Sequence, residues 1–399
     1  MKYKLEDVFK FIRNGANIKQ GGQEGYPITR IETIAHREVD RTKMGYADIF
    51  DISNFEKYIL NEGDILMSHI NSEKHLGKVA IYESHHEDEK IIHGMNLLCL
   101  RPNVERVHPK YIYHYFNSSN FARELNKIIK HSVNQSSFAI RDIKKLRIQL
   151  PPMNMQIKIA NILDKAQLMI NKRQQQIEAI SLLQQSIYNK MFMEKQNDQS
   201  EVLLKDVCSI NPRKSEIEEE LHDLEISFIP MVSVSEDGDI DLNESRILKE
   251  VYRNYTYFAE NDILFAKITP CMENGKGAIA RGLQNKIGFG SSEFHVLRPK
   301  KGTTPEWVYF LTKSKKFRKT AEENMTGSAG QKRVPRKFLE NYPVMLHSKS
   351  KQEEFKNIYY KTEKNKQVLN ESLRELEKLN ASLLQKAFNG ELFNNKVNI

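Results

Sequence analysis

Four loops of the sequence carry side chains that could bind a polyanion. Two of them, residues 131–142 (HSVNQSSFAIRD) and residues 325–337 (MTGSAGQKRVPRK), combine amides, small hydroxyl groups and cations. The other two, residues 69–78 (HINSEKHLGK) and residues 267–276 (KITPCMENGK), carry similar residue types. Amides and guanidinium groups can pair with base edges, whereas lysines and backbone amides hold phosphates. We therefore expect these loops to contact a nucleic acid, with an ordinary exposed polar loop as the alternative at each position.

The candidate contact residues are selected from these loops by side-chain chemistry. They are His69, Asn71, Lys74, Lys78, Asn134, Gln135, Ser136 and Arg141 in the first half, and Lys267, Thr269, Lys276, Ser328, Gln331, Lys332 and Arg333 in the second. A basic segment at 313–319, KSKKFRK, is interpreted as a helix face that touches phosphate or is simply solvated.

Motifs that would indicate catalysis are missing from the sequence. There is no P-loop, no GxSxG and no HExxH, and the LPPM segment at 150–153 is not the Asn/Asp-Pro-Pro-aromatic site of an amino-methyltransferase. Asp237, Asp239 and Asp241 have the alternate spacing that opens a calcium loop, but Leu242 and Leu248 stand where that loop needs glycine and glutamate. We therefore expect no catalytic residues and no metal site in this chain.

The composition favours a polyanion as the partner. Lys and Arg number 61 against 52 Asp and Glu, which gives a formal charge of +9 and a pI near 9.1. Such an excess is typical of nucleic-acid-binding proteins, although a merely basic protein is the alternative. The three cysteines, Cys99, Cys208 and Cys271, lie far apart, and no apolar run is long enough for a membrane span or a signal peptide. These observations predict a cytoplasmic protein without a disulfide framework.

The chain repeats one plan twice. NEGDILMSHI at 61–70 returns as ENDILFAKI at 260–268, and LLCLRP at 97–102 returns as FHVLRP at 294–299. From Gln135 onward the offset stays at 196 residues, so that Gln135 matches Gln331 and Gln156 matches Gln352. The scaffold residues repeat while the loop residues differ, as expected if one scaffold presents two different binding surfaces.

Each half changes character once, which predicts an α+β fold of two pseudo-repeated halves. A mixed, mainly β globular domain comes first, with short β-rich runs and brief helices, and a long helix follows. The predicted boundaries are 1–152 for the first globular domain, 153–198 for the central helix and linker, 199–350 for the second globular domain, and 351–399 for the C-terminal helix. Pro151 and Pro152 should mark the first joint, because proline ends one segment and is tolerated in the first turn of a helix.

Apolar residues at alternating spacings of three and four follow both predicted helices. Leu163, Ile170 and Ile177 begin the stripe in the first, and polar Gln184 interrupts it at the position that Asn380 occupies in the second. The pattern predicts that the helices pair as an antiparallel coiled coil, with a globular domain at each end. The alternative is that each helix folds back onto its own globular domain.

The pattern resembles the specificity (S) subunits of type I restriction-modification systems over nearly the whole chain. The similarity is carried by Leu150–Pro152, Gln156 and Ile159–Asp164 at the first helix start, and by GDIL/NDIL, the LRP strands, TGSAGQKRVP and LLQKAFNGELF. In the second copy, MLHSKSKQEEF keeps Gln352 but has neither the prolines nor the ILD core, which leaves the start of the second helix open.

This resemblance implies a non-catalytic DNA-recognition subunit. Each globular domain would be a target recognition domain for one half of an asymmetric bipartite site on double-stranded DNA, and the helices would set the spacing. Two methyltransferase (M) subunits that carry S-adenosylmethionine would dock on this chain, which would bind no cofactor itself, and motor-nuclease (R) subunits would add cleavage. The expected docking or spacer residues are Gln156, Leu163, Ile170, Ile177, Gln184, Leu373, Leu376, Asn380 and Leu383. Two rival functions stay open, a structural coiled-coil protein and a DNA-acting enzyme with a divergent catalytic centre.

Overall fold

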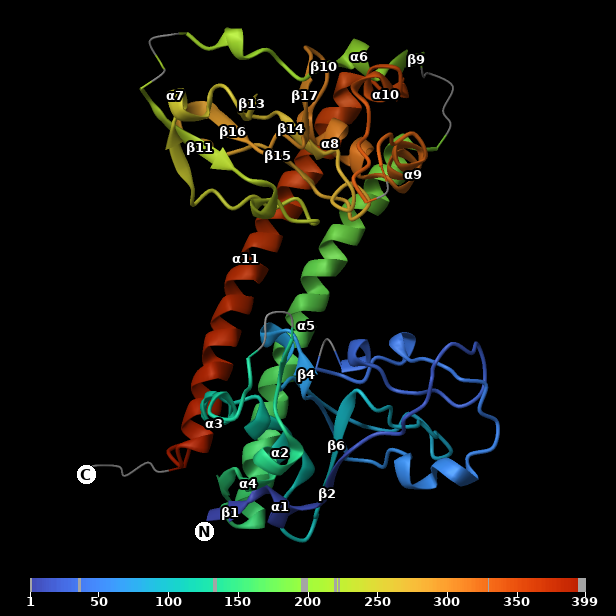
Figure 1. Ribbon diagram of the computed structural model, residues 1–399. Helices are drawn as coiled ribbons and strands as arrows, with labels where there is room; N and C mark the ends of the chain where they lie inside the picture. Colours follow the sequence, from blue (N-terminus) through green and yellow to red (C-terminus); the bar gives the residue numbers. More distant parts are fainter. Residues whose placement is uncertain are drawn as a thin grey trace, which may run out of the picture. The chain divides into compact units, whose positions relative to one another are not determined.

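The computed structural model describes residues 2–34, 37–131, 135–194, 200–218, 221, 223–328 and 330–393. Contacts divide the chain into two compact units (Figure 1). Unit 1 contains Met1–Arg173 and Ser372–Ile399, and unit 2 contains Gln174–Glu371. Each unit therefore includes part of both long helices, α5 (Met153–Phe192) and α11 (Lys349–Phe388). The linear domain boundaries given above remain a prediction.

The core of unit 1 is built on both faces of one antiparallel sheet. Its strand order is β2 (Phe9–Asn14), β6 (Leu97–Pro102), β3 (Ile65–Ser68), β5 (Val79–Ile81). All four residues of β3 are buried, and because successive side chains alternate, Ile65 and Met67 join one apolar cluster while Leu66 joins another. The short apolar runs of the sequence are therefore strands that are covered on both faces.

Shorter elements surround this sheet. The strand pairs are β1 (Lys2–Lys4) with β8 (Arg147–Gln149), and β4 (Ile70–Asn71) with β7 (Ser136–Ser137). The α-helices are α1 (Leu5–Val8), α2 (Pro109–Phe116), α3 (Ser119–Asn126) and α4 (Ile140–Lys145), and the 3-10 helices are η1 (Ile31–Ile34), η2 (Arg41–Lys43), η3 (Ser53–Tyr58) and η4 (Glu73–His75).

Unit 2 repeats the first sheet and adds a second. Strands β10 (Cys208–Ile210), β17 (Phe294–Pro299), β14 (Ile263–Ala266) and β15 (Gly277–Ile279) follow the same order as in unit 1. The added sheet contains β12 (Ser245–Ile247), β11 (Glu225–Ile229), β16 (Ile287–Gly290) and β13 (Thr256–Ala259), with β11 and β16 parallel. A two-stranded sheet joins β18 (Pro343–Leu346) to β9 (Ser200–Leu203). The helices are α6 (Leu204–Val207), α7 (Leu248–Val251), α8 (Pro305–Lys313), α9 (Lys315–Glu323) and α10 (Arg336–Glu340), with 3-10 helices at η5 (Lys214–Glu216), η7 (Met231–Ser233) and η8 (Gln284–Lys286).

A buried ion pair is reproduced in both units. Arg101 donates from Nε and Nη2 to Asp64 at 2.8 and 2.7 Å, and Arg298 donates to Asp262 in the same way at the same distances. Both carboxylates are almost fully buried, at 0% and 1% exposed side chain. The repeated GDIL/NDIL and LRP segments of the sequence are thus two halves of one interaction.

The starts of the long helices use different caps for the same purpose. The carbonyl of Pro152 accepts hydrogen bonds from Met155 N and Gln156 N, and α5 begins at Met153 as predicted. In the second half Ser348 takes the place of Pro152, since its carbonyl accepts from Gln352 N at 3.2 Å and its Oγ from Lys351 N at 3.4 Å. A serine cap therefore replaces the proline joint, and α11 begins at Lys349.

Buried glutamines fasten each helix start to its globular part. Gln156 accepts from His108 N at 2.9 Å and donates to the Pro151 carbonyl at 3.0 Å. Gln352 accepts from Thr304 N and donates to the His347 carbonyl, both at 2.9 Å. These contacts explain why the glutamine persists in both copies when the prolines do not.

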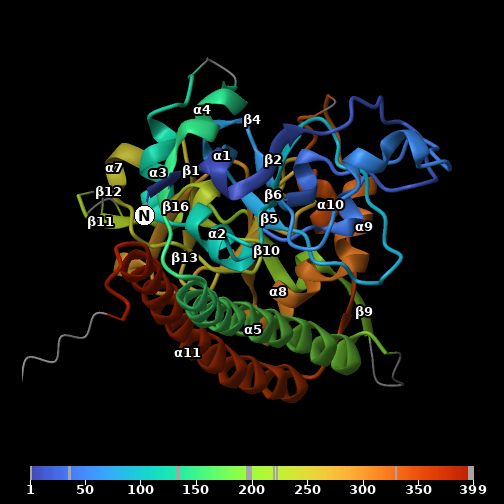
Figure 2. The ribbon, with the colours of Figure 1, turned by 90° about the horizontal axis from the view of Figure 1, so that it is seen from below.

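The predicted antiparallel pairing of the helices is observed in unit 2. Gln184 of α5 donates to Thr362 Oγ1 and Glu363 Oε1 of α11, both at 2.8 Å, while the rings of Tyr188 and Phe355 lie 5.3 Å apart. Residue numbers thus rise along α5 as they fall along α11. In unit 1 Leu163 and Ala387 share the core of the globular part, so the helix segments there also pack on that domain. Figure 2 shows the two helices side by side.

Candidate nucleic-acid interface

The pairing of β4 with β7, just beyond the end of β3, places two predicted loops of unit 1 together. Ser68, the last residue of β3, pairs with Leu97, and the chain then enters β4, where Ile70 pairs with Ser137 and Asn71 with Ser136. The loop at 69–78 therefore lies beside the loop at 131–142. Residues 132–134, including the candidate Asn134, lie outside the described part of the chain.

Unit 2 joins its two loops in an equivalent way. Isolated bridges connect Ile268 with Arg333 and Thr326 with Arg333, and Thr269 N donates to the Lys332 carbonyl at 3.0 Å. The loops at 267–276 and 325–337 are therefore neighbours, apart from residue 329, which is not described. Sequence reasoning grouped these loops only by composition and repeat position, and the backbone pairing brings them together.

The candidates of unit 1 divide between exposed and buried side chains. Lys74, Gln135 and Arg141 are exposed, whereas Asn71 and Lys78 are half-buried. His69 is buried with its ring 6.4 Å from that of Phe138, and burial lowers its pKa. Ser136 is also buried within β7.

His69 and Ser136 therefore do not present a side chain at the surface, contrary to expectation. Both residues lie where the two loops pair with each other, so packing between the loops covers them. They are better described as supports of the loop pair.

The candidates of unit 2 show the same division. Ser328, Gln331 and Lys332 are exposed. Three others are tied to the unit's own atoms: Lys267 Nζ donates to the Ser292 carbonyl at 2.7 Å, Lys276 Nζ to the Met231 carbonyl at 3.3 Å, and Thr269 Oγ1 to Glu273 Oε1 at 3.2 Å. Arg333 forms a two-pronged ion pair with Glu293.

Two functional candidates were missed by sequence reasoning. Glu293 lies outside the four loops, and its pairing with Arg333 spans 40 residues, so no local pattern points to it. Arg318, inside the basic segment at 313–319, points inward: it donates to the carbonyls of Met272 at 2.9 Å and Gly275 at 3.2 Å, and burial lowers its pKa to about 10. Lys315, Lys316 and Lys319 of that segment are exposed. Arg318 thus holds the loop at 267–276 rather than facing solvent.

Several residues expected to dock a subunit are buried. Gln156 and Leu163 are covered within unit 1, Gln184 is covered within unit 2, and Ile170 is also buried, so none of them can meet another protein directly. Partial exposure leaves a smaller set of candidates, namely Ile177, Leu373, Leu376, Asn380 and Leu383. Asn380 lies in unit 1, so it does not share a contact layer with Gln184.

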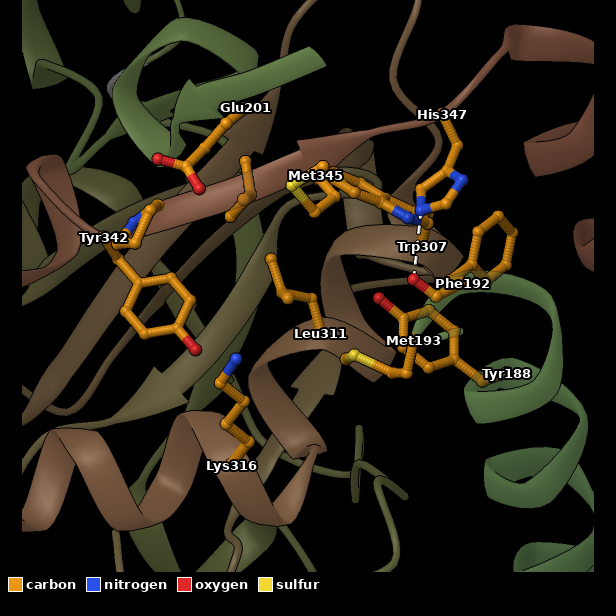
Figure 3. A pocket seen from close by; sticks show the side chains of 12 residues that line it. Tyr188, Phe192, Met193, Glu201, Trp307, Leu311, Lys316, Tyr342, Met345 and His347 are labelled. Carbon is orange, nitrogen blue, oxygen red and sulfur yellow. Dashed lines mark hydrogen bonds between the residues drawn. The ribbon is translucent and has the colours of Figure 1, made fainter. Parts of the chain in front are cut away.

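An apolar cavity of about 300 Å³ lies in unit 2 beside the end of α5 (Figure 3). Its wall includes Tyr188, Phe192, Trp307 and Met345, and the indole Nε1 of Trp307 has no hydrogen-bond partner among the described residues. A cavity of about 180 Å³ occupies the corresponding place in unit 1, where Tyr111 stands for Trp307 and Phe388 for Phe192. There the wall also includes the chain's own Leu392 and Phe393, so the unit 1 cavity is partly closed by residues that follow α11.

Metal-binding side chains, membrane-spanning helices and cysteines can also be examined in the structure. Within the described residues no group of three or more His, Cys, Asp or Glu side chains is placed to hold a metal ion. None of the helices in the described ranges has the length and apolar character needed to cross a membrane. Cys99 and Cys208 are buried and Cys271 is partly exposed, all with free thiols.

Sequence comparison identifies the family. The model of the type I restriction modification DNA specificity domain matches residues 1–179 and again 197–378. The chain is 43% identical over 189 residues to a putative type I restriction enzyme MjaX specificity subunit of Methanocaldococcus jannaschii, a match over 47% of this chain and 44% of that protein. It is 46% identical over 150 residues to the EcoAI specificity subunit of Escherichia coli, over 37% of this chain and 25% of that protein. The matches thus span less than half the length of either relative.

Solved structures support the same fold at low sequence identity. A chain from a study of complex assembly and conformational transition of the type I R-M system aligns over 98% of both chains, with a TM-score of 0.53 and 14% identity. A type I restriction-modification system S subunit from M. genitalium aligns over 97% of this chain and 96% of that one, with a TM-score of 0.52 and 15% identity. With two matches of the family model covering most of its length, the chain belongs to the type I restriction-modification DNA specificity domain family.

Proposed function

We propose that this chain is the DNA-specificity subunit of a type I restriction-modification complex, and that each unit reads one half of an asymmetric bipartite site. The observation that carries the proposal is that both units join two polar loops just beyond the end of an equivalent strand, β3 in unit 1 and β14 in unit 2. The two units share an exposed glutamine, Gln135 and Gln331, but other exposed side chains on these loops differ, with Lys74 and Arg141 in unit 1 against Ser328 and Lys332 in unit 2. One scaffold that carries two different surfaces suits two different half-sites.

The partners of the proposed complex are double-stranded DNA, two methyltransferase subunits and motor-nuclease subunits. S-adenosylmethionine would be bound by the methyltransferase subunits, and this chain would contribute no catalytic group. We propose that the half-buried helix residues and the two apolar cavities beside the helix ends receive apolar side chains of the methyltransferase subunits. The complex would be cytoplasmic.

The long helices are proposed to set the distance between the two half-sites. Each has 40 residues, which corresponds to about 60 Å of helix, and one turn of DNA is about 34 Å. Deleting four residues between 170 and 185 is expected to change the spacer of the methylated site or abolish assembly. An unchanged spacer in an active complex would show that the helices are not the ruler.

The decisive experiment is methylation mapping of a host that expresses the chain with its cognate methyltransferase subunits. A bipartite, asymmetric motif is expected, and exchanging Gln331 should alter only one half of it. Uniform loss at both halves would contradict separate readers. Methyl transfer or DNA cleavage by the purified chain alone would favour the rival enzyme hypothesis. The absence of salt-dependent DNA binding would favour the structural one.

A further inference from the structure

Glu293 occupies the edge of the unit 2 sheet where the predicted DNA-contacting loops meet. Ala266, the last residue of β14, pairs with Phe294, the first residue of β17. The next residues outward are therefore Lys267 and Glu293, and Lys267 N donates to the Glu293 carbonyl at 2.9 Å. A carboxylate thus stands between the loop at 267–276 and the loop at 325–337.

Arg333 fixes the direction of this carboxylate. Its Nε donates to Oε2 at 2.9 Å and its Nη2 to Oε1 at 2.8 Å, while Nη1 donates to the Gln331 carbonyl at 3.1 Å. Most of the donors of Arg333 are therefore engaged within the unit, so it is poorly placed to read a base by itself. The Glu293 side chain keeps 26% of its surface exposed. The hydrogen bonds from Arg333 also lower the pKa of Glu293, so the carboxylate is ionised at neutral pH.

Phosphate repels an ionised carboxylate, so a contact between Glu293 and DNA would be favourable where the carboxylate accepts a hydrogen bond. Oε1 accepts from both Nη2 and Nε of Arg333, whereas Oε2 accepts only from Nε and keeps a lone pair for another donor. In the major groove, the donors that a carboxylate can meet are the exocyclic amines, above all cytosine N4, and also adenine N6. Exposed Lys332 and Arg336 nearby supply the positive charge that a phosphate requires.

We propose that Glu293 is a specificity-determining residue that accepts a hydrogen bond from the exocyclic amine of a cytosine or an adenine, and that Arg333 is its positioning residue. This inference rests on the proposed DNA-specificity function. The competing explanation is that the ion pair only fastens one loop to the other. In unit 1 the equivalent positions carry Asn96, which is exposed, and Ser137, so the proposed carboxylate–base contact is specific to unit 2.

The test uses the full chain in its complex with the cognate methyltransferase subunits and measures methylation over a library of randomised sites. Glu293→Gln keeps the size of the side chain but replaces one acceptor oxygen with a donor. At one position of the unit 2 half-site, the preference for an amine-bearing base should fall about ten-fold or more. The half-site of unit 1 should not change.

A charge exchange separates base reading from loop fastening. The double variant Glu293→Arg with Arg333→Glu can rebuild the ion pair but moves the carboxylate away from the proposed base contact. Base reading predicts that the altered preference persists although thermal unfolding returns toward that of the parent chain. Recovery of the base preference of the parent complex would overturn the proposal and show that the ion pair only holds the two loops together.

Glu340→Gln is the matched control, because Glu340 forms an exposed ion pair with Arg336 on α10 in the same unit. It should leave every base preference unchanged. If the parent complex shows no sequence preference at all, the proposed function itself fails. If the parent complex is specific and Glu293→Gln has the same base preferences, only the inference about Glu293 fails.

Discussion

One ion pair appears in both units with its charges exchanged. In unit 1 Lys110 of α2 pairs with Glu83 at 2.7 Å, and in unit 2 the equivalent positions hold Glu306 of α8 and Arg281, which also pair. The surroundings differ more than the contact. The side chains of Lys110 and Glu83 are 41% and 53% exposed, whereas that of Glu306 is fully buried. An ion pair can therefore keep its position in the fold while its contribution to the free energy of unfolding changes greatly with burial.

The sheet edges that carry the paired loops show the opposite behaviour. His69, Asn96 and Ser137 in unit 1 are replaced by Lys267, Glu293 and Arg333 in unit 2, and no side-chain contact is common to the two sets. Beneath them, the Asp–Arg pairs and the helix-fastening glutamines are the same in both units. The buried polar contacts of the two units are therefore the same, whereas the side chains at the loop-bearing edges differ.

The charge-exchanged pair gives the largest expected difference. Arg281→Ala leaves the buried carboxylate of Glu306 without its partner, and should reduce the free energy of unfolding of unit 2 by about 3–5 kcal/mol. Glu83→Ala breaks an exposed pair and should cost unit 1 less than about 1 kcal/mol. Hydrogen exchange during urea unfolding can follow both units, and fluorescence of Trp307 reports unit 2. Equal losses from the two variants would show that burial does not set the value of this pair.

The buried imidazole of His295 should make unit 2 sensitive to acid. Its Nε2 donates to the Val334 carbonyl at 2.8 Å and its Nδ1 accepts from Asn211 Nδ2 at 3.1 Å, so the neutral form is satisfied. Burial is the main cause that lowers the pKa to about 4, with smaller contributions from Lys267 and Arg336, while the hydrogen bond to Val334 and the charge of Glu293 oppose the shift.

As the pH falls, the unfolded chain takes up this proton near its ordinary pKa of about 6.5 and the folded unit does so only near 4. The contribution of His295 is therefore complete above about pH 6.5 and is lost progressively toward pH 4, by up to about 3 kcal/mol. His295→Phe should flatten the pH dependence of unit 2 unfolding, measured by Trp307 fluorescence. His131→Phe, at an exposed site of unit 1, is the control, and an unchanged slope in His295→Phe would refute the assignment.

The buried glutamines at the two helix starts should contribute similarly to the free energy of unfolding of their units. Gln352→Leu leaves one backbone N–H and one carbonyl without a side-chain partner, and Gln156→Leu leaves one N–H and the carbonyls of Pro151 and Arg106. Each variant should lower the free energy of unfolding by about 1–3 kcal/mol. Thermal unfolding monitored by hydrogen exchange would resolve the two. A much smaller loss for Gln352→Leu would indicate that the Ser348 cap alone holds α11.

The smallest expected effect concerns the exposed cations of the two edges. Lys74→Ala and Lys332→Ala should each weaken DNA binding without changing the sequence preference, because lysine contacts phosphate. In each variant, the slope of log affinity against log salt should become shallower by about 0.9. Salt titrations of DNA binding by the complex would measure this, and a change of base preference would instead place that lysine at a base.

Local patterns predicted the repeated parts of the fold well. The apolar run at 97–102 is β6, and the uninterrupted segment from Met153 to Phe192 is α5 with those same limits. Composition selected four loops, and pairing places them together in twos. In each case neighbouring residues carry enough information, since hydrophobic period and proline position act locally.

Residues controlled by distant partners could not be predicted. In the added sheet of unit 2, β11 pairs in parallel with β16, which lies about 60 residues later in the sequence, and no local pattern predicts that pairing. His69 was expected at the surface but is covered by Phe138, and Arg318 turns inward to loop carbonyls that precede it by more than 40 residues. Burial and ion pairing of this kind depend on the finished fold.

Unit 1 is assembled from both ends of the sequence, and this has a consequence for how the protein is made. Asn120 Nδ2 donates to the Phe388 carbonyl at 3.1 Å, the rings of Tyr111 and Phe388 lie 5.3 Å apart, and Ala387 is buried in the unit 1 core. During translation, the first globular part emerges long before these residues exist. The apolar residues of unit 1 that contact Ala387 and Phe388 in the folded protein stay exposed to chaperones or to wrong partners while all of unit 2 is synthesised. Unit 2, which is one continuous segment, has no such delay, so the part of the chain that is made first is completed last.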